Sequence, residues 1–199
     1  MCIRDSRGRK QSHRLSINVP GQHNVSNALS AVAMGQALGI SMERIATGLA
    51  KFRPVAMRSQ LKSLQGLTII EDCYNANPAS MKAALTLLKK LAQGKRTIAV
   101  VGDMLELGKN AKALHQEDGA YISDLSISYL IVCGGLGQEI AHGAKKRGMA
   151  GSRVFLANTT SHGAEYLKKI ARPGDVVLLK ASRNMKLENV LNGFLLEKK

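Results

Sequence analysis

The sequence contains no tryptophan, only three cysteines and few other aromatic residues, and each scarcity excludes a class of protein. Cys2, Cys73 and Cys133 form no CxxC pair, so their spacing indicates neither a disulfide framework nor a zinc site and suits the reducing cytoplasm. No stretch approaches the ~20 consecutive apolar residues that a membrane helix requires, so we expect no membrane partner. What remains, 45% hydrophobic and 22% charged residues, is typical of a globular chain.

Acidic residues are also scarce, because 14 Asp and Glu stand against 29 Lys and Arg and leave a net charge of +15. A basic balance occurs in proteins that bind nucleic acid, anionic membranes or phosphorylated ligands. The excess is spread along the chain, and it is not interleaved with the aromatic residues that stack on bases. We therefore expect no nucleic-acid partner and attribute the charge to a phosphate-bearing small molecule.

From about residue 60 onward, short runs rich in Val and Ile alternate with longer segments of helical periodicity. Strands are expected at 67–71, 97–101, 129–133, 154–157 and 175–180, and helices at 79–93, 111–125, 137–147, 160–171 and 184–196. Consecutive β-branched positions indicate strands that are buried on both faces, as in a parallel sheet. The alternation predicts an α/β domain with a Rossmann-like, mostly parallel sheet and flanking helices.

The first 57 residues have a different pattern. The expected elements are a strand at 15–19, helices at 24–38 and 41–51, and a linker at 52–57. Two helices and one strand make a poor independent core, so we expect the tail of another domain, with its apolar helix faces partly exposed. The domains predicted are therefore 1–57, in which residues 1–14 are atypical, and 58–199.

Polar side chains follow several of the predicted strands, where ligands of parallel sheets bind. They are Asp72, Asn75 and Asn77 in EDCYNANP, Asp103 and Glu106 in VGDMLELG, and Ser182 and Arg183 in LKASR. A carboxylate at a strand end can accept hydrogen bonds from ribose hydroxyls, and a Ser and an Arg at a helix start can bind a carboxylate or phosphate. The alternative for the first group is a turn that caps the next helix, which Pro78 would open.

Other segments carry weaker indications. Asn24 and Asn27 share one face of a predicted helix, and an Asn side chain offers the donor and acceptor that an adenine edge requires. The glycine-rich segment 134–139 lacks the Lys and Ser/Thr of a phosphate loop and is interpreted as a turn. The five histidines have no metal-ligand spacing, so no metal site is expected in this sequence.

Four strings together resemble the Mur ligases of bacterial peptidoglycan synthesis: PGQHNVSNALS, EDCYNANPASMKAAL, VVGDMLELG and LLKASRNMKLENV. The similarity runs from about Leu15 to the C-terminus, and YNANP followed by GDMLELG is specific to the member that joins D-alanyl-D-alanine to UDP-N-acetylmuramoyl-tripeptide. The resemblance implies that ATP, with Mg²⁺, phosphorylates the tripeptide carboxylate and that the dipeptide amine attacks the acyl phosphate. It implies a cytoplasmic monomer with small-molecule substrates that serves cell-wall biogenesis, and thereby cell shape and division.

The resemblance also assigns roles to individual residues. Asn27 would contact adenine, Asp72 the ribose hydroxyls and Arg58 the ATP phosphates, while Tyr74, Asn75 and Asn77 would line the nucleotide or the incoming substrate. Asp103 would position the attacking amine, His115 would belong to the substrate site, and Ser182 with Arg183 would hold a substrate carboxylate. Arg58 and Asp103 are thus the expected catalytic residues, which act by positioning and by stabilising charge.

The sequence departs from the family pattern at three places. Met57 and Ala181 stand where the family usually has glycine, and Glu71 stands where it has aspartate. The reacting side chains are kept, so these changes are expected to affect loop conformation more than role. An alanine at 181 would cost about 1 kcal/mol if the backbone there needed a positive φ.

The family's UDP-binding domain, its phosphate loop, most of its magnesium ligands and its modified lysine have no counterpart in this sequence. We therefore expect a carboxyl-terminal fragment, preceded by the tail of the central ATPase domain, that is inactive alone because nothing grips the β- and γ-phosphates. The alternative is a stand-alone nucleotide-binding or interaction module without catalysis.

Overall fold

The computed structural model describes residues 2–4 and 13–196, and its contacts divide the chain into two units, Met1–Val55 and Ala56–Lys199. The sequence places the boundary two residues later, between 57 and 58. Most of the atypical segment 1–14 lies outside the described residues.

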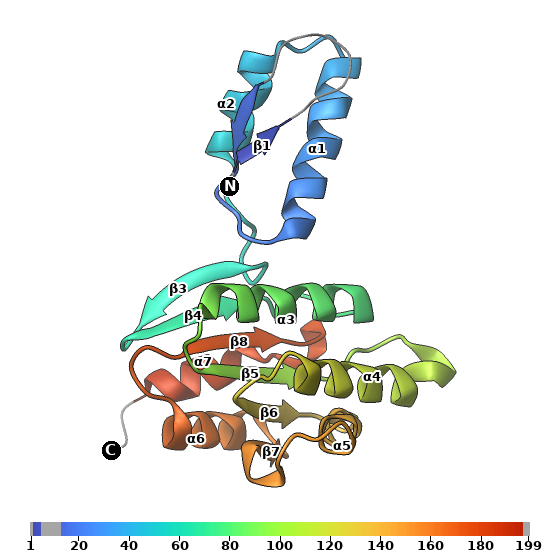
Figure 1. Ribbon diagram of the computed structural model, residues 1–199, viewed down its shortest axis with the longest axis vertical. Helices are drawn as coiled ribbons and strands as arrows, with labels where there is room; N and C mark the ends of the chain where they lie inside the picture. The colour runs from blue at the N-terminus through green and yellow to red at the C-terminus, as the bar shows by residue number, and fades with distance from the viewer. Residues whose placement is uncertain (1, 5–12, 197–199) are drawn as a thin grey trace. The chain divides into compact units, whose positions relative to one another are not determined.

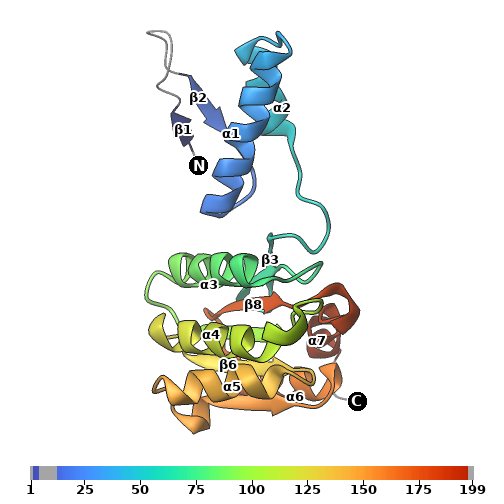
Figure 2. The same cartoon turned by 90° about the vertical axis from the view of Figure 1, so that its right-hand side faces the viewer.

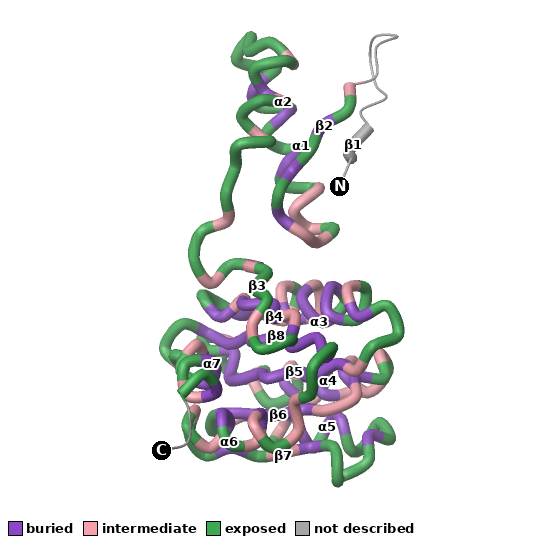
Figure 3. The backbone as a smooth tube through the Cα atoms, turned by 90° about the vertical axis from the view of Figure 1, so that its left-hand side faces the viewer, coloured by how far each residue is buried: buried purple, intermediate pink, exposed green. Residues whose placement is uncertain are grey.

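The first unit has a small core. Its elements are the antiparallel strands β1 (Cys2–Arg4) and β2 (Arg14–Ser16), followed by the helices α1 (Gln22–Ala37) and α2 (Met42–Lys51). The buried cluster consists of Leu15, Ile17, Ala28, Val32 and Ile45. Both predicted helices are confirmed, and the predicted strand at 15–19 is shorter and begins one residue earlier. Much of the unit is exposed (Figure 3), including the apolar side chains of Met34 and Leu38 on α1 and just beyond it.

The second unit is built on a six-stranded sheet of order β3-β4-β8-β5-β6-β7. The strands are β3 (Gln60–Leu64), β4 (Leu67–Glu71), β5 (Thr97–Gly102), β6 (Tyr129–Cys133), β7 (Val154–Ala157) and β8 (Val176–Lys180). All neighbours pair in parallel except β3 and β4, and Figure 1 shows β3 running against the others. The predicted mostly parallel sheet is confirmed. Strand β3 was not predicted, because QLKSL lies at the sheet edge, has no run of buried side chains and shows no apolar pattern.

Helices cover both faces of this sheet (Figures 1 and 2). They are α3 (Pro78–Ala92), α4 (Ala111–Asp124), α5 (Gly137–Lys146), α6 (Thr160–Ile170) and α7 (Glu188–Leu195). Buried residues of α3, α4 and α5 pack with one set of strand residues, and those of α6 and α7 pack with the alternate set. The last predicted helix, 184–196, begins only at Glu188, because Lys186 has a φ of 46° that ends a short 3₁₀ turn over Arg183–Met185.

The strand sequences explain this layering. Ile70 and Val101 face the α3–α5 side while Ile69 and Val100 face α6 and α7, and all four side chains are fully buried. Because successive side chains of a strand point to opposite faces, a two-sided core requires the continuous Val and Ile runs. No helix among the described residues is long and apolar enough to cross a bilayer.

Candidate functional site

The carboxyl ends of β4, β8, β5 and β6 meet along one border of the sheet, and we call the segments that follow them (72–77, 181–183, 103–106 and 134–136) the carboxyl edge. Ser182 links two of these segments. Its backbone N–H donates to the carbonyl oxygen of Asp103 at 3.0 Å, and its hydroxyl oxygen accepts from the N–H of Leu105 at 2.9 Å. The polar segments that follow β8 and β5 are therefore joined by hydrogen bonds in the fold.

Lys180 lies beneath this edge with only 1% of its surface exposed. Its ammonium donates to Oδ2 of Asp72 at 2.8 Å and to the carbonyl oxygen of Asn75 at 3.0 Å. The other oxygen of Asp72 accepts from the N–H of Ser59 at 3.0 Å. A carboxylate has about four acceptor positions, so Asp72 keeps capacity for hydroxyl donors.

Arg58 reaches the edge from the segment before β3. Its guanidinium lies 4.3 Å from the centroid of the Tyr74 ring, and the N–H of Tyr74 donates to the carbonyl of Met57 at 3.1 Å. Arg58 and Tyr74 are both exposed. Met57 has a φ of 59°, in the region that favours glycine, so the departure from the family pattern does carry a backbone cost there. Ala181 has no positive φ, so the penalty considered for that residue does not arise.

The two asparagines of the first group have local roles. Asn77 caps α3 by accepting from the N–H of Ser80 at 2.8 Å, while its own N–H donates to the Ser80 hydroxyl at 3.0 Å. Pro78 is the first helical residue, as the capping interpretation predicts. The side-chain oxygen of Asn75 accepts from the N–H of Ala76 at 2.9 Å, and Asn75 remains exposed.

Asp103 is 7% exposed, and its carboxylate accepts from the N–H groups of Gly135 and Leu136, each at 3.0 Å. Burial raises the pKa of Asp103, while the hydrogen bond from Leu136 acts in the opposite direction. A Cβ atom at Gly134, where φ is 110°, would lie 2.5 Å from Asp103 Oδ1. The glycine-rich turn predicted at 134–139 thus supplies donors to Asp103, a role that its sequence alone does not reveal.

His115 is fully buried under the segment that follows β5. Its Nε2 lies 2.9 Å from the N–H of Met104 and its Nδ1 lies 2.6 Å from the carbonyl oxygen of Ala111. Since an N–H can only donate and a carbonyl can only accept, the ring must carry its proton on Nδ1. His115 was expected to belong to the substrate site, but its side chain has no exposed surface that a substrate could contact. Both ring nitrogens are already hydrogen-bonded to backbone groups. His115 instead fixes the course of the chain after Asp103.

Arg183 is exposed at the edge, and its guanidinium donates to Glu188 Oε1 at 2.7 Å and contacts Met57 Sδ at 3.6 Å. The hydrogen bond to Glu188 raises the pKa of this guanidinium. Ser182 is buried, and its hydroxyl is already engaged by Leu105. Cys73 lies 3.9 Å from Glu188, and burial raises the pKa of its thiol to about 12, so it is not a nucleophile at neutral pH.

Asn27 belongs to the other unit, where it is exposed on α1 and donates to Asn24 at 3.4 Å. Among residues 2–4 and 13–196, no three His, Cys, Asp or Glu side chains come together as a metal site.

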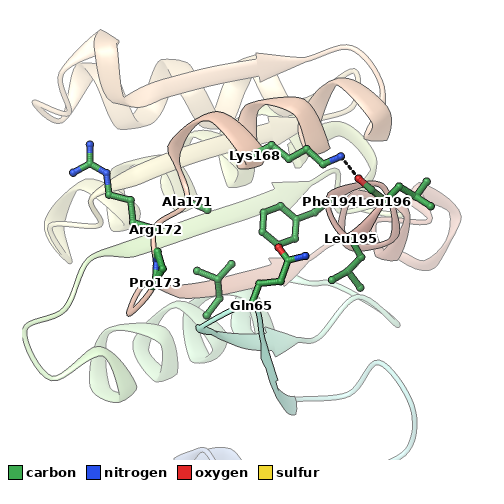
Figure 4. A pocket seen from close by; sticks show the side chains of 9 residues that line it. Gln65, Lys168, Ala171, Arg172, Pro173, Phe194, Leu195 and Leu196 are labelled. Carbon is green, nitrogen blue, oxygen red and sulfur yellow. Dashed lines mark hydrogen bonds between the residues drawn. The ribbon is translucent and has the colours of Figure 1, made fainter. Parts of the chain in front are cut away.

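A pocket of about 330 Å³ lies at the opposite border of the second unit, lined by Leu67, Pro173 and Phe194 among others (Figure 4). It adjoins the beginnings of β4 and β8 and contains none of the predicted site residues.

Known proteins show the same combination of sequence and fold. The family profile described as "Mur ligase, glutamate ligase domain" matches residues 57–183. The UDP-N-acetylmuramoyl-tripeptide–D-alanyl-D-alanine ligase of Bacillus subtilis is 42% identical over 182 residues, and the alignment covers 88% of this chain and 38% of that protein. The same ligase of Mycobacterium tuberculosis (strain H37Rv) is 39% identical over 189 residues, covering 83% of this chain and 36% of the relative.

Solved structures agree. MurF from Acinetobacter baumannii superposes with a TM-score of 0.80 at 28% identity, covering 91% of this chain and 39% of that one. MurF ligase from Thermotoga maritima in complex with ADP has a TM-score of 0.76 at 26% identity and covers 92% and 40% of the two chains. The chain therefore spans about two fifths of the length of the proteins it matches.

Proposed function

Because the chain belongs to the Mur ligase family, we propose that it acts in the ATP-dependent joining of D-alanyl-D-alanine to UDP-N-acetylmuramoyl-tripeptide during peptidoglycan synthesis in the cytoplasm. The observation that carries the proposal is the assembly of three strand-end segments, containing YNANP, GDMLEL and KASR, by the hydrogen bonds of Lys180 and Ser182. The ligases of Bacillus subtilis and Mycobacterium tuberculosis, which bear this activity in their names, support the choice of substrates.

The nucleotide half of the proposal rests on Asp72, Arg58 and Tyr74. Asp72 is held by Lys180 and retains lone pairs for the ribose hydroxyls. Arg58, oriented by its stacking on Tyr74, would place an exposed positive charge near the ATP phosphates. Asn75 and Asn77 would lie beside the nucleotide or the incoming substrate, and Asn27 of the first unit would contact the adenine. Mg²⁺, when bound with ATP, would neutralise phosphate charge; the described residues offer no cluster of their own to hold it.

The acceptor half rests on Asp103 and Arg183. A dipeptide presents a carboxylate at one end and an amine at the other, and Arg183 is an exposed cation suited to the carboxylate. Asp103 is a carboxylate whose position is fixed by two backbone donors and by the loop that His115 holds, so it can orient the amine. The amine then forms the amide bond with the carbonyl carbon of the acyl phosphate, and inorganic phosphate leaves. Ser182 and His115 are positioning residues in this scheme.

The experiment is a chimaera in which residues 15–199 replace the matching part of the Bacillus subtilis ligase, so that the relative supplies the length this chain does not span. We expect phosphate release that requires both UDP-N-acetylmuramoyl-tripeptide and D-alanyl-D-alanine. A folded chimaera that binds ATP but forms no amide would contradict the ligase assignment and favour the alternative, a nucleotide-binding module without catalysis.

A further inference from the structure

The carboxyl edge, where the proposed reaction would take place, does not carry the excess positive charge of the chain. The cations at or next to the carboxyl edge are Arg58, Lys180 and Arg183, and two of them are already paired, Lys180 with Asp72 and Arg183 with Glu188. Phosphate and carboxylate substrates at that edge therefore do not account for a net charge of +15.

Within the second unit, lysines lie together instead at the opposite border of the sheet. Helices α3, α5 and α6 all run back from the carboxyl edge, and each ends there in a lysine pair: Lys89–Lys90, Lys145–Lys146 and Lys168–Lys169. We call these six residues the basic edge. None of the six forms an ion pair with a carboxylate in the described part of the chain. Two acidic residues of this border, Asp124 and Asp175, are already paired with Arg147 and Arg96.

Lysines in a last helical turn are favourable to the dipole of their own helix. Even Glu165, which precedes Lys168 and Lys169 on α6, forms no ion pair with either among the described residues. Apolar side chains accompany them. Leu195 and Leu196, at the end of α7, are 39% and 69% exposed, and the ammonium of Lys168 donates to the Leu196 carbonyl beside them (Figure 4). Exposed leucines next to unpaired lysines suit a surface that is anionic outside and apolar just beneath.

We propose that the basic edge docks the protein on an anionic lipid bilayer surface. This proposal replaces the expectation of no membrane partner, which rested on the lack of a membrane-spanning run and does not bear on binding at the surface. A membrane fits better than nucleic acid, because the aromatic residues nearest this border, Tyr129, Phe155 and Tyr166, pack on one another and are not free to stack on bases. Docking through this border leaves the carboxyl edge of the same unit facing away from the bilayer. The inference does not depend on the ligase reaction.

The test is sedimentation of the full chain with phosphatidylcholine vesicles, with and without phosphatidylglycerol, at physiological salt. We expect sedimentation with the anionic vesicles alone. Since each lysine near a charged membrane contributes to binding, K145Q/K146Q and K168Q/K169Q should each lower the partition coefficient by about tenfold or more. The matched control is K109Q/K112Q, which removes the same charge from exposed lysines near the carboxyl edge and should change the coefficient less than about twofold.

Circular dichroism establishes that each variant is folded. The proposal is overturned if the chain does not sediment with anionic vesicles, or if the control pair loses as much binding as the basic-edge pairs. Retention of duplex DNA at the same salt without vesicle binding would also overturn it, since the partner would then be nucleic acid.

Discussion

The ammonium of Lys180 and the carboxylate of Asp72 lie 2.8 Å apart although 108 positions separate them in the chain, and the lysine side chain is only 2% exposed. The pair ties the ends of the adjacent parallel strands β8 and β4. The Lys180 ammonium also donates to the carbonyl oxygen of Asn75, and this hydrogen bond connects the ion pair to the loop before α3. The geometry of the proposed nucleotide site thus depends on one buried cation.

Replacing Lys180 with methionine should therefore lower the free energy of unfolding by about 3 kcal/mol, because it leaves a largely buried carboxylate without its partner. Urea unfolding followed by tyrosine fluorescence measures the effect on the second unit, which contains all four tyrosines. Lys109→Met, at an exposed lysine that pairs with no carboxylate in the described part of the chain, is the control and should change stability by less than about 0.5 kcal/mol. Equal effects of the two substitutions would show that the ion pair is not stabilising.

Asp118 on α4 is a second buried carboxyl group, and neither of its oxygens has a hydrogen-bond partner among the described residues. Burial raises its pKa to about 7, while Lys82 and Lys180 act in the opposite direction and Glu117 adds to the rise. The folded state therefore holds a proton that the unfolded state has released above pH ~4. The contribution of Asp118 to stability is greatest below that pH, falls as the pH rises to about 7 and then levels off, with a total change on the order of 4 kcal/mol.

Asp118→Asn should abolish most of this pH dependence, because the amide does not titrate. Unfolding free energies measured between pH 5 and 8 provide the check. Glu117→Gln, at the exposed neighbouring position, should leave most of the slope in place, because burial raises the pKa of Asp118 more than Glu117 does. A slope that survives in the asparagine variant would assign the titration to another group.

His115→Phe should destabilise the second unit by about 2 kcal/mol, because the N–H of Met104 and the carbonyl of Ala111 lose their side-chain partner. The effect should be local as well as global. Hydrogen exchange should accelerate more at the Met104 amide than at the amides of β6, because no group of β6 is hydrogen-bonded to the His115 ring. Unchanged protection at Met104 would show that the loop after β5 does not depend on the histidine.

Glycine at position 57 should give a more stable protein than alanine there. Both substitutions remove the side chain, but the φ of 59° penalises alanine and not glycine, so Met57→Gly should be about 1 kcal/mol more stable than Met57→Ala. At the adjacent Ala56, which has no positive φ, changing alanine to glycine should not stabilise. Urea unfolding of the three variants decides the matter, and an alanine variant as stable as the glycine variant would contradict the backbone argument.

Much of this fold is predictable from the sequence, because buried parallel strands require long Val and Ile runs such as 97–101 and 129–133. Strand β3 escapes prediction, since an exposed edge strand needs no such run. The polar strand ends are predictable as well, since sheet topology brings them together. Individual side-chain contacts cannot be predicted in this way. Lys180 is a charged residue at the end of a wholly buried strand, and only the folded structure shows that its ammonium pairs with Asp72.

The same limit applies to His115 and Glu188. His115 occurs close after GDMLELG in the sequence, which suggests substrate contact, but its burial follows from how α4 packs under the loop. Glu188 follows Arg183 by five residues, and their pairing depends on the turn at Lys186 that redirects the chain into α7.

The most direct test of the proposed site is the KM for D-alanyl-D-alanine of the chimaeric ligase carrying Arg183→Ala. We expect this KM to rise by about tenfold or more while the KM for ATP stays within about twofold, since a charge-assisted hydrogen bond to the dipeptide carboxylate is lost. Lys186→Ala, which removes an exposed cation three positions away, should change neither. An unchanged dipeptide KM in the Arg183 variant, or an equal rise for both substrates, would contradict the placement of the acceptor at the carboxyl edge.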